Sequence, residues 1–262
     1  MIRRLLILLS LPVLASCSSV PDAAPPAGQF LARSLPFEGR TFPYQVFVPA
    51  QRDAAGTPIV LFLHGSGERG SDGRRQLQAG LGPWLRQNTG TFPALVVFPQ
   101  APDDEEWQGR TARMALAALD AASAEFHGDP HRTYLTGMSL GGYGTWELAL
   151  MQPQRFAALV PVCAAILAPR AERPSLVVDQ VAGEADPYGA VVSRLRTVPI
   201  WMFHGARDDV VPPDDARRLY QAALAAHANV RYTEYPGTNH NAWDPTYRNP
   251  AMWQWLFKQR RD

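Results

Sequence analysis

The sequence predicts an α/β protein built on a mostly parallel, doubly wound sheet, and three observations lead to this prediction. Short continuous apolar runs, such as 58–63 and 95–98, are typical of strands that are buried on both faces of a sheet. These runs alternate with segments in which apolar residues recur at helical spacing. Before the first run, residues 41–48 alternate apolar and polar side chains, which suits an antiparallel hairpin at one edge of the sheet.

The strands are expected where β-branched and other apolar residues lie between prolines and glycines. Pro43 lies inside the second strand and indicates an edge position, because proline cannot donate a hydrogen bond to a neighbouring strand. The expected strands are 30–34, 41–48, 58–63, 95–98, a run that begins at 133, 156–163, 199–203 and 230–235.

The helices are expected where apolar residues form a stripe along one face. Gly82-Pro83 should break or kink the first helix. Residues 164–196 have weak periodicity and several prolines and glycines, so we expect an irregular excursion over the sheet edge. The expected helices are 75–88, 111–126, the segment 145–151 after the glycine-rich turn, 213–226 and 250–259.

Composition limits the class of protein and its partners. The chain has 262 residues, 46% of them hydrophobic and 19% charged, which suits a single large domain over 29–262. A formal net charge of +1 gives no field that would attract nucleic acid. The two cysteines lack zinc-type spacing, and Cys163 lies in an apolar run and is expected to be a buried core residue. We expect no metal and no cofactor, and the oligomeric state cannot be read.

The N-terminus has the pattern of a bacterial lipoprotein signal. Residues 1–16 form a basic start followed by an apolar stretch too short to span a bilayer. The run Leu14-Ala15-Ser16-Cys17 resembles a lipobox, which implies lipidation of Cys17; the alternative is an ordinary secretory signal cleaved nearby. Residues 17–28 are expected to be a disordered tether. The prediction is a cell-envelope lipoprotein, sorted to an outer membrane, that touches the membrane only through its anchor.

Ser139 is the candidate nucleophile. It stands in Gly137-Met138-Ser139-Leu140-Gly141, between an apolar run and a segment with helical spacing. This strand–turn–helix context is that of a nucleophile elbow, in which glycines two residues on either side relieve crowding around a strained serine. The alternative interpretation is a glycine-rich turn with a capping serine and no catalysis.

Serine catalysis of acyl transfer also needs a base, a carboxylate that orients the base, and donors for the oxyanion. An acidic pair, Asp208 and Asp209, follows the strand that ends at Phe203. His240 follows the last expected strand in a polar, glycine-containing loop, and it is the only histidine so placed after the acidic pair. A surface histidine and solvated loop acids are the alternative.

Taken together, these motifs resemble one branch of the α/β-hydrolase superfamily. Its members are predicted peptidases, phospholipase/carboxylesterase-type and dienelactone-hydrolase-like esterases, and relatives of feruloyl esterases. The resemblance covers about 30–260 and is carried by His64-Gly65-Ser66-Gly67-Glu68-Arg69-Gly70, Pro99-Gln100-Ala101-Pro102 with Trp107, Gly137-Met138-Ser139-Leu140-Gly141-Gly142, Asp208 and His240.

The resemblance implies the α/β-hydrolase fold and particular roles for residues. His204-Gly205-Ala206-Arg207-Asp208-Asp209-Val210-Val211-Pro212 is similar to a superfamily segment whose register makes Asp208, rather than Asp209, the triad acid. The loop 64–67 stands where the oxyanion loop belongs. One oxyanion donor would be the Leu140 N–H and the other the Ser66 N–H, or that of Gly67.

The predicted function is therefore a serine carboxylic-ester hydrolase that forms an acyl-enzyme on a small or carbohydrate- or aromatic-linked ester. One alternative is a serine peptidase of the prolyl-oligopeptidase-like type, and another is a non-catalytic binding protein of the envelope. Trp107, Trp243 and Gly67 are weak candidates for substrate binding, since tryptophans at such positions also serve as core packing.

Overall fold

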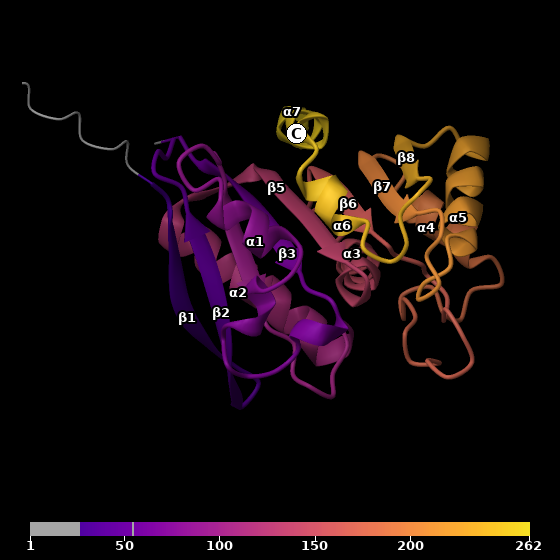
Figure 1. Cartoon of the computed structure of the whole chain (residues 1–262), viewed down its shortest axis with the longest axis horizontal. Helices are drawn as coiled ribbons and strands as arrows, with labels where there is room; N and C mark the ends of the chain where they lie inside the picture. Colours follow the sequence, from indigo (N-terminus) through magenta and orange to yellow (C-terminus); the bar gives the residue numbers. More distant parts are fainter. Residues whose placement is uncertain (1–26, 54) are drawn as a thin grey trace, which may run out of the picture.

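The fold is one twisted sheet between two layers of helices (Figure 1). The structure is a computed structural model that describes residues 27–53 and 55–262. Within that part of the chain, the sheet has eight strands in the order β1-β2-β4-β3-β5-β6-β7-β8. β1 pairs antiparallel with β2 and β2 antiparallel with β4, whereas all other neighbours are parallel. The predicted fold class and its antiparallel N-terminal hairpin are confirmed.

The elements follow the expected alternation of strands and helices. The strands are β1 (Gln29–Phe37), β2 (Arg40–Val48), β3 (Thr57–Leu63), β4 (Leu95–Pro99), β5 (Gly128–Met138), β6 (Ala158–Val162), β7 (Ile200–Gly205) and β8 (Val230–Tyr235). The helices are α1 (Leu81–Arg86), α2 (Gly109–Phe126), α3 (Leu140–Met151), α4 (Pro187–Arg194), α5 (Asp214–Ala225), α6 (Trp243–Tyr247) and α7 (Pro250–Lys258), and two 3₁₀ turns lie at Ser66–Glu68 and Arg75–Leu77.

Two hydrophobic cores fill the space between the sheet and the helices. Successive side chains of a strand point to opposite faces, so the unbroken apolar run of β3 supplies both cores. Ile59 and Leu61 face the core that includes buried side chains of α2, α3, α4 and α5. Val60 and Phe62 face the core that includes α1, α6 and α7. Burial on both faces explains why these strands lack an alternating pattern.

The structure corrects the interpretation of Pro43. β2 is not an edge strand, because it pairs with β4 over Tyr44–Phe47, and β1 forms the edge instead. Pro43 lies one residue outside the β4 ladder, opposite Ser34 of β1. Its missing N–H therefore costs no hydrogen bond to β4, and proline is tolerated in an interior strand.

Two helical expectations also need correction. The segment 75–88 is broken at Gly80, whose φ of 65° and ψ of −123° are not helical, and Pro83 lies in the first turn of α1. Proline is tolerated there because the N–H groups of a first turn have no intrahelical partner. The irregular excursion contains α4, whose N-cap Asp186 accepts a hydrogen bond from the Gly189 N–H. The short α6, between β8 and α7, was not expected.

The N-terminal predictions fall largely outside the described residues. The signal 1–16, Cys17 and the tether up to residue 26 are not described. Gly28, expected in the tether, donates its N–H to Thr89 O at 2.8 Å, so fixed contacts begin one residue earlier than 29. None of the described helices combines the length and apolar character needed to cross a membrane.

Candidate active site

Ser139 lies in a sharp turn between β5 and α3. Its φ of 53° and ψ of −120° fall in the left-handed half of conformational space, which is costly for a residue with a side chain. A Cβ on Gly137 would lie 2.1 Å from Gly141 O, and a Cβ on Gly141 would lie 1.9 Å from Leu63 O. Both positions therefore admit only glycine, which is the steric reason predicted for the motif. The Ser139 N–H is held by Val162 O at 2.9 Å.

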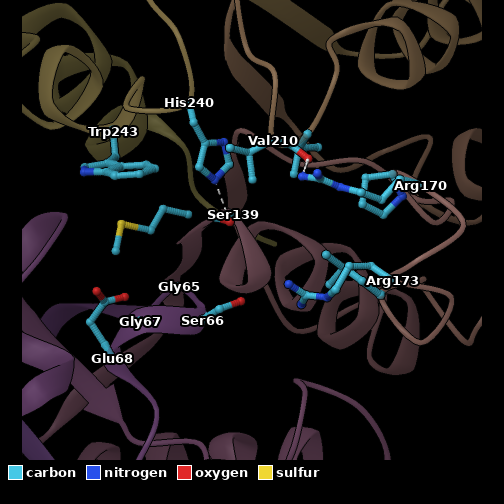
Figure 2. A pocket seen from close by; sticks show the side chains of 14 residues that line it. Gly65, Ser66, Gly67, Glu68, Ser139, Arg170, Arg173, Val210, His240 and Trp243 are labelled. Carbon is cyan, nitrogen blue, oxygen red and sulfur yellow. Dashed lines mark hydrogen bonds between the residues drawn. The ribbon is translucent and has the colours of Figure 1, made fainter.

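The structure brings Ser139, His240 and Asp208 together from three separate loops. His240 Nε2 lies 2.9 Å from Ser139 Oγ, and His240 Nδ1 lies 2.8 Å from Asp208 Oδ2 (Figure 2 draws the first contact). An ionised carboxylate can only accept a hydrogen bond, so Nδ1 carries the hydrogen and Nε2 is free to accept the serine proton. The three loops follow the parallel strands β5, β7 and β8 of one sheet, whose carboxyl ends lie on the same side of the sheet.

Asp208 is a buried anion with several donors. Its Oδ1 accepts from the Val210 and Val211 N–H groups at 3.0 and 2.9 Å, and its side chain is 0% exposed. Burial alone would raise the pKa of Asp208, but hydrogen bonds from His204, His240 and the Val211 N–H outweigh it and hold this pKa well below the usual range. Asp208 is therefore ionised throughout the neutral pH range.

Asp209, the alternative acid, is exposed, and the structure places Asp208 rather than Asp209 against His240. His204, at the end of β7, has its Nε2 2.8 Å from Val211 O. The same atom also lies 3.3 Å from Asp208 Oδ2, a contact that the sequence analysis did not foresee. The His-Gly dipeptide four residues before the aspartate is the signal that could have suggested it.

The loop after β3 is fixed by a neutral histidine. His64 is fully buried, and burial lowers its pKa to about 4. Its Nδ1 lies 2.7 Å from Gly65 O, and its Nε2 lies 3.0 Å from the Ala101 N–H that donates to it. Because one ring nitrogen must donate and the other accept, these two contacts set the tautomer and hold Gly65 in place.

The predicted oxyanion donors lie beside the serine. Leu140 is the first residue of α3, and Ser66 and Gly67 line the cavity in front of Ser139 (Figure 2). Within residues 27–53 and 55–262, neither the Leu140 N–H nor the Ser66 N–H donates to another protein group. Both N–H groups therefore remain available to a ligand oxygen, as do donors at any helix start.

A cavity of about 260 Å³ opens over Ser139. Trp243 lines it and packs edge-on against the His240 ring, with centroids 5.3 Å apart. Trp107 does not line this cavity, so the structure contradicts its candidacy for substrate binding. It is 1% exposed, packs against the His64 ring and donates its indole N–H to His64 O at 3.0 Å. It supports the loop from behind.

The sequence analysis missed several residues that line the cavity. Arg170 and Arg173 come from the excursion whose pattern was unreadable, and Glu68 comes from the predicted oxyanion loop. Figure 2 shows both arginines on the side of Ser139 away from Glu68 and Trp243. With these three charged residues, the cavity is more polar than one lined by the predicted Trp107, Trp243 and Gly67 would be.

Three potential metal ligands also meet at this site. Single ligand atoms of Cys163, Asp208 and His240 lie within 4.8 Å of one another. Asp208 and His240 are bonded to each other, and the Cys163 thiol donates to His240 O at 2.9 Å. Burial raises the pKa of this thiol strongly, so it stays protonated. All three groups are thus engaged in protein hydrogen bonds. Cys163 is buried, as predicted.

Comparisons with known proteins agree with this fold. The profile of the prolyl oligopeptidase family matches residues 103–168, which include Ser139. A putative carboxymethylenebutenolidase of Salmonella typhimurium (strain LT2) is 25% identical over 255 residues, covering 90% of this chain and 85% of that protein. The solved structure of a thermostable esterase superposes with a TM-score of 0.74 at 31% identity over 88% of this chain.

The chain is an α/β-hydrolase. The identity to the esterase and the mostly parallel sheet with its antiparallel start support an α/β-hydrolase family of serine hydrolases. A ferulic acid esterase structure, 17% identical, shares the fold with a TM-score of 0.66. This α/β-hydrolase spans 63% of the length of the thermostable esterase and 42% of an acylaminoacyl peptidase from Pyrococcus horikoshii that also shares the fold.

Proposed function

We propose that this α/β-hydrolase is a serine carboxylic-ester hydrolase that works through an acyl-enzyme on Ser139. The observation that carries the proposal is the hydrogen-bonded series from Ser139 Oγ through His240 to the ionised Asp208. Its order along the chain, serine, then aspartate, then histidine, is that of the α/β-hydrolase triad.

The geometry supports a two-step mechanism. His240 Nε2 takes the hydroxyl proton as Ser139 Oγ attacks the ester carbonyl, and the Leu140 and Ser66 N–H groups stabilise the oxyanion that forms. His240 then passes the proton to the departing alcohol, which leaves an acyl group on Ser139. Water attacks that acyl group with His240 again as base, and the carboxylic acid is released. Asp208 stays ionised and holds the tautomer of His240 throughout.

An ester is favoured over a peptide as substrate by the relatives of higher identity. The thermostable esterase is 31% identical to this chain, whereas the acylaminoacyl peptidase is 14% identical. A serine peptidase remains the second candidate, because the matched profile is that of the prolyl oligopeptidase family. The same residues would serve either reaction, so substrate comparison has to separate them.

The test is hydrolysis of 4-nitrophenyl esters and of matched aminoacyl 4-nitroanilides by the full-length protein, its Ser139→Ala variant and a Ser193→Ala control. Ser193 is exposed on α4, so its loss should change nothing. We expect ester turnover that falls on the order of 10⁴- to 10⁶-fold in Ser139→Ala. Preferential cleavage of the anilides would favour the peptidase. Equal ester turnover in Ser139→Ala and wild type would refute catalysis by this serine.

A non-catalytic binding protein, the remaining alternative from the sequence, is tested on the same samples. A fluorophosphonate probe should label wild type and Ser193→Ala but not Ser139→Ala. Absence of labelling in folded wild-type protein would support the binding protein and contradict the proposed function.

A further inference from the structure

Two arginines line one side of the cavity over Ser139, and neither was used in the mechanism above. Arg170 and Arg173 both belong to the segment between β6 and α4. Figure 2 shows the Arg173 guanidinium directed toward the space between Ser66 and Ser139. Of the described residues that line this cavity, Glu68 alone is acidic, and Figure 2 shows it on the side of Ser139 away from the arginines. Burial raises the pKa of Glu68.

The segment that carries these arginines is anchored at both ends by acids, of which Glu147 is buried and Asp215 partly buried. Asp215 of α5 accepts from the Ile166 and Leu167 N–H groups at 2.8 and 3.3 Å. Glu147 of α3 accepts from the N–H and the side-chain amide of Gln180, at 3.3 and 3.2 Å. These hydrogen bonds fix the backbone on either side of 170–173. Arg170 itself is exposed, and Arg173 is half-buried.

The arginines also have donors to spare. Arg170 donates to Val210 O at 2.9 Å, in the loop that carries Asp208, and makes no described ion pair. Arg173 makes one contact with Glu106, at 3.4 Å, which is at the outer limit of a hydrogen bond. A guanidinium has five N–H donors in a planar fork that matches a carboxylate. Most donors of this pair are therefore unused within the described residues.

We propose that Arg170 and Arg173 form an anion subsite, and that the substrates of this enzyme are esters that carry a carboxylate. This inference rests on the proposed function and names its substrate class. The subsite selects the substrate by charge, and the chemistry at Ser139 is unchanged. The charged group could belong to the acyl part or to the alcohol part, and paired substrates distinguish the two.

The first pair compares mono-4-nitrophenyl glutarate with 4-nitrophenyl pentanoate, which places the charge in the acyl part. The second compares 4-acetoxybenzoate with its methyl ester, which places the charge in the alcohol part. The measured quantity is the ratio of kcat/KM for the charged ester to that for the neutral ester. A guanidinium–carboxylate contact of ordinary strength should raise this ratio to about ten- to a hundredfold in one pair.

Arg173→Gln should bring the ratio close to one, and Arg170→Gln should lower it. The matched control is Arg196→Gln, an exposed arginine outside the cavity, which should keep the wild-type ratio. Added salt should reduce the ratio in wild type, since it screens exposed charges. Arg173→Lys, which keeps the charge but not the fork, should give an intermediate ratio and guards against a misfolded glutamine variant.

The outcomes separate the two proposals. Ratios at or below one in both pairs, with neutral esters still hydrolysed through Ser139, would overturn the anion subsite alone. Ratios that survive Arg173→Gln, Arg173→Lys and Arg170→Gln would overturn it as well. If no ester is hydrolysed, the proposed function fails, and calorimetry of Ser139→Ala with methyl hydrogen glutarate against dimethyl glutarate tests the subsite. Equal binding of the two compounds would then overturn it, and tighter binding of the charged one would support it.

Discussion

Gly141→Ala should damage both the stability and the activity of this protein, because the nucleophile turn has no room for a methyl group at this position. The added Cβ would lie 1.9 Å from Leu63 O, 2.4 Å from Leu63 C and 2.7 Å from His64 O. All three are backbone atoms at the end of β3, so no side-chain rotation can relieve the clash. Overpacking in a well-packed core costs about 1–3 kcal/mol, and a contact with rigid backbone belongs at the upper end.

A loss of about 3 kcal/mol corresponds to a fall in Tm of roughly 6–12 °C for a domain of this size. The displaced Leu63–His64 backbone also leads into the predicted oxyanion loop. A shift of about 1 Å in a catalytic group can cost on the order of 10²-fold in rate. We therefore expect kcat to fall by at least that factor, even in the fraction that remains folded.

The assay is calorimetric Tm together with kcat on a 4-nitrophenyl ester, measured well below the Tm. The control is Gly183→Ala, because Gly183 is exposed and a Cβ there would meet nothing within 4 Å. It should leave kcat unchanged and leave Tm unchanged or slightly raised. A Gly141→Ala variant with the Tm and kcat of wild type would refute the steric account of the turn.

Two further substitutions test the charges around the site. Asp208→Asn keeps an oxygen acceptor but presents an amide to His240 Nδ1, which favours the wrong tautomer, so kcat should fall by about 10⁴-fold. Asp209→Asn is its exposed control, and an equal loss in that variant would contradict the assignment. Glu147 is a buried carboxyl whose pKa is raised by burial, so ionisation costs stability as pH rises through its folded pKa. Glu147→Gln should therefore be more stable than wild type at pH 7. Chemical denaturation should show that this gain disappears below pH 4.5, the ordinary carboxyl pKa. A gain that does not depend on pH would exclude ionisation of Glu147 as its cause.

The parts of the site that follow from local constraints could be predicted from the sequence. Gly137 and Gly141 are required by contacts within one turn and with the adjacent strand, so the motif carries its own geometry. Asp208 and His240 each follow a strand, and parallel strands bring their carboxyl ends to one side of the sheet. The predicted fold class rested on the same alternation of strands and helices and was confirmed.

The parts that depend on distant contacts could not be predicted. The segment with Arg170 and Arg173 is fixed by hydrogen bonds to Asp215 and Glu147, and such contacts leave no periodic pattern in the segment itself. Trp107 stands in a motif beside the site, but its ring packs behind the loop, and residue type alone cannot tell the two positions apart. Lipidation of Cys17 and a location in the cell envelope stay predictions from sequence.

The most direct test of the central claim is to trap the acyl-enzyme. Rapid mixing of the full-length protein with excess 4-nitrophenyl ester should release a burst of about one 4-nitrophenolate per active site when deacylation is slow, and peptide mapping after acid quench should find the acyl group on Ser139. Acyl transfer to another residue, or ester hydrolysis that continues at the wild-type rate in Ser139→Ala, would contradict the account.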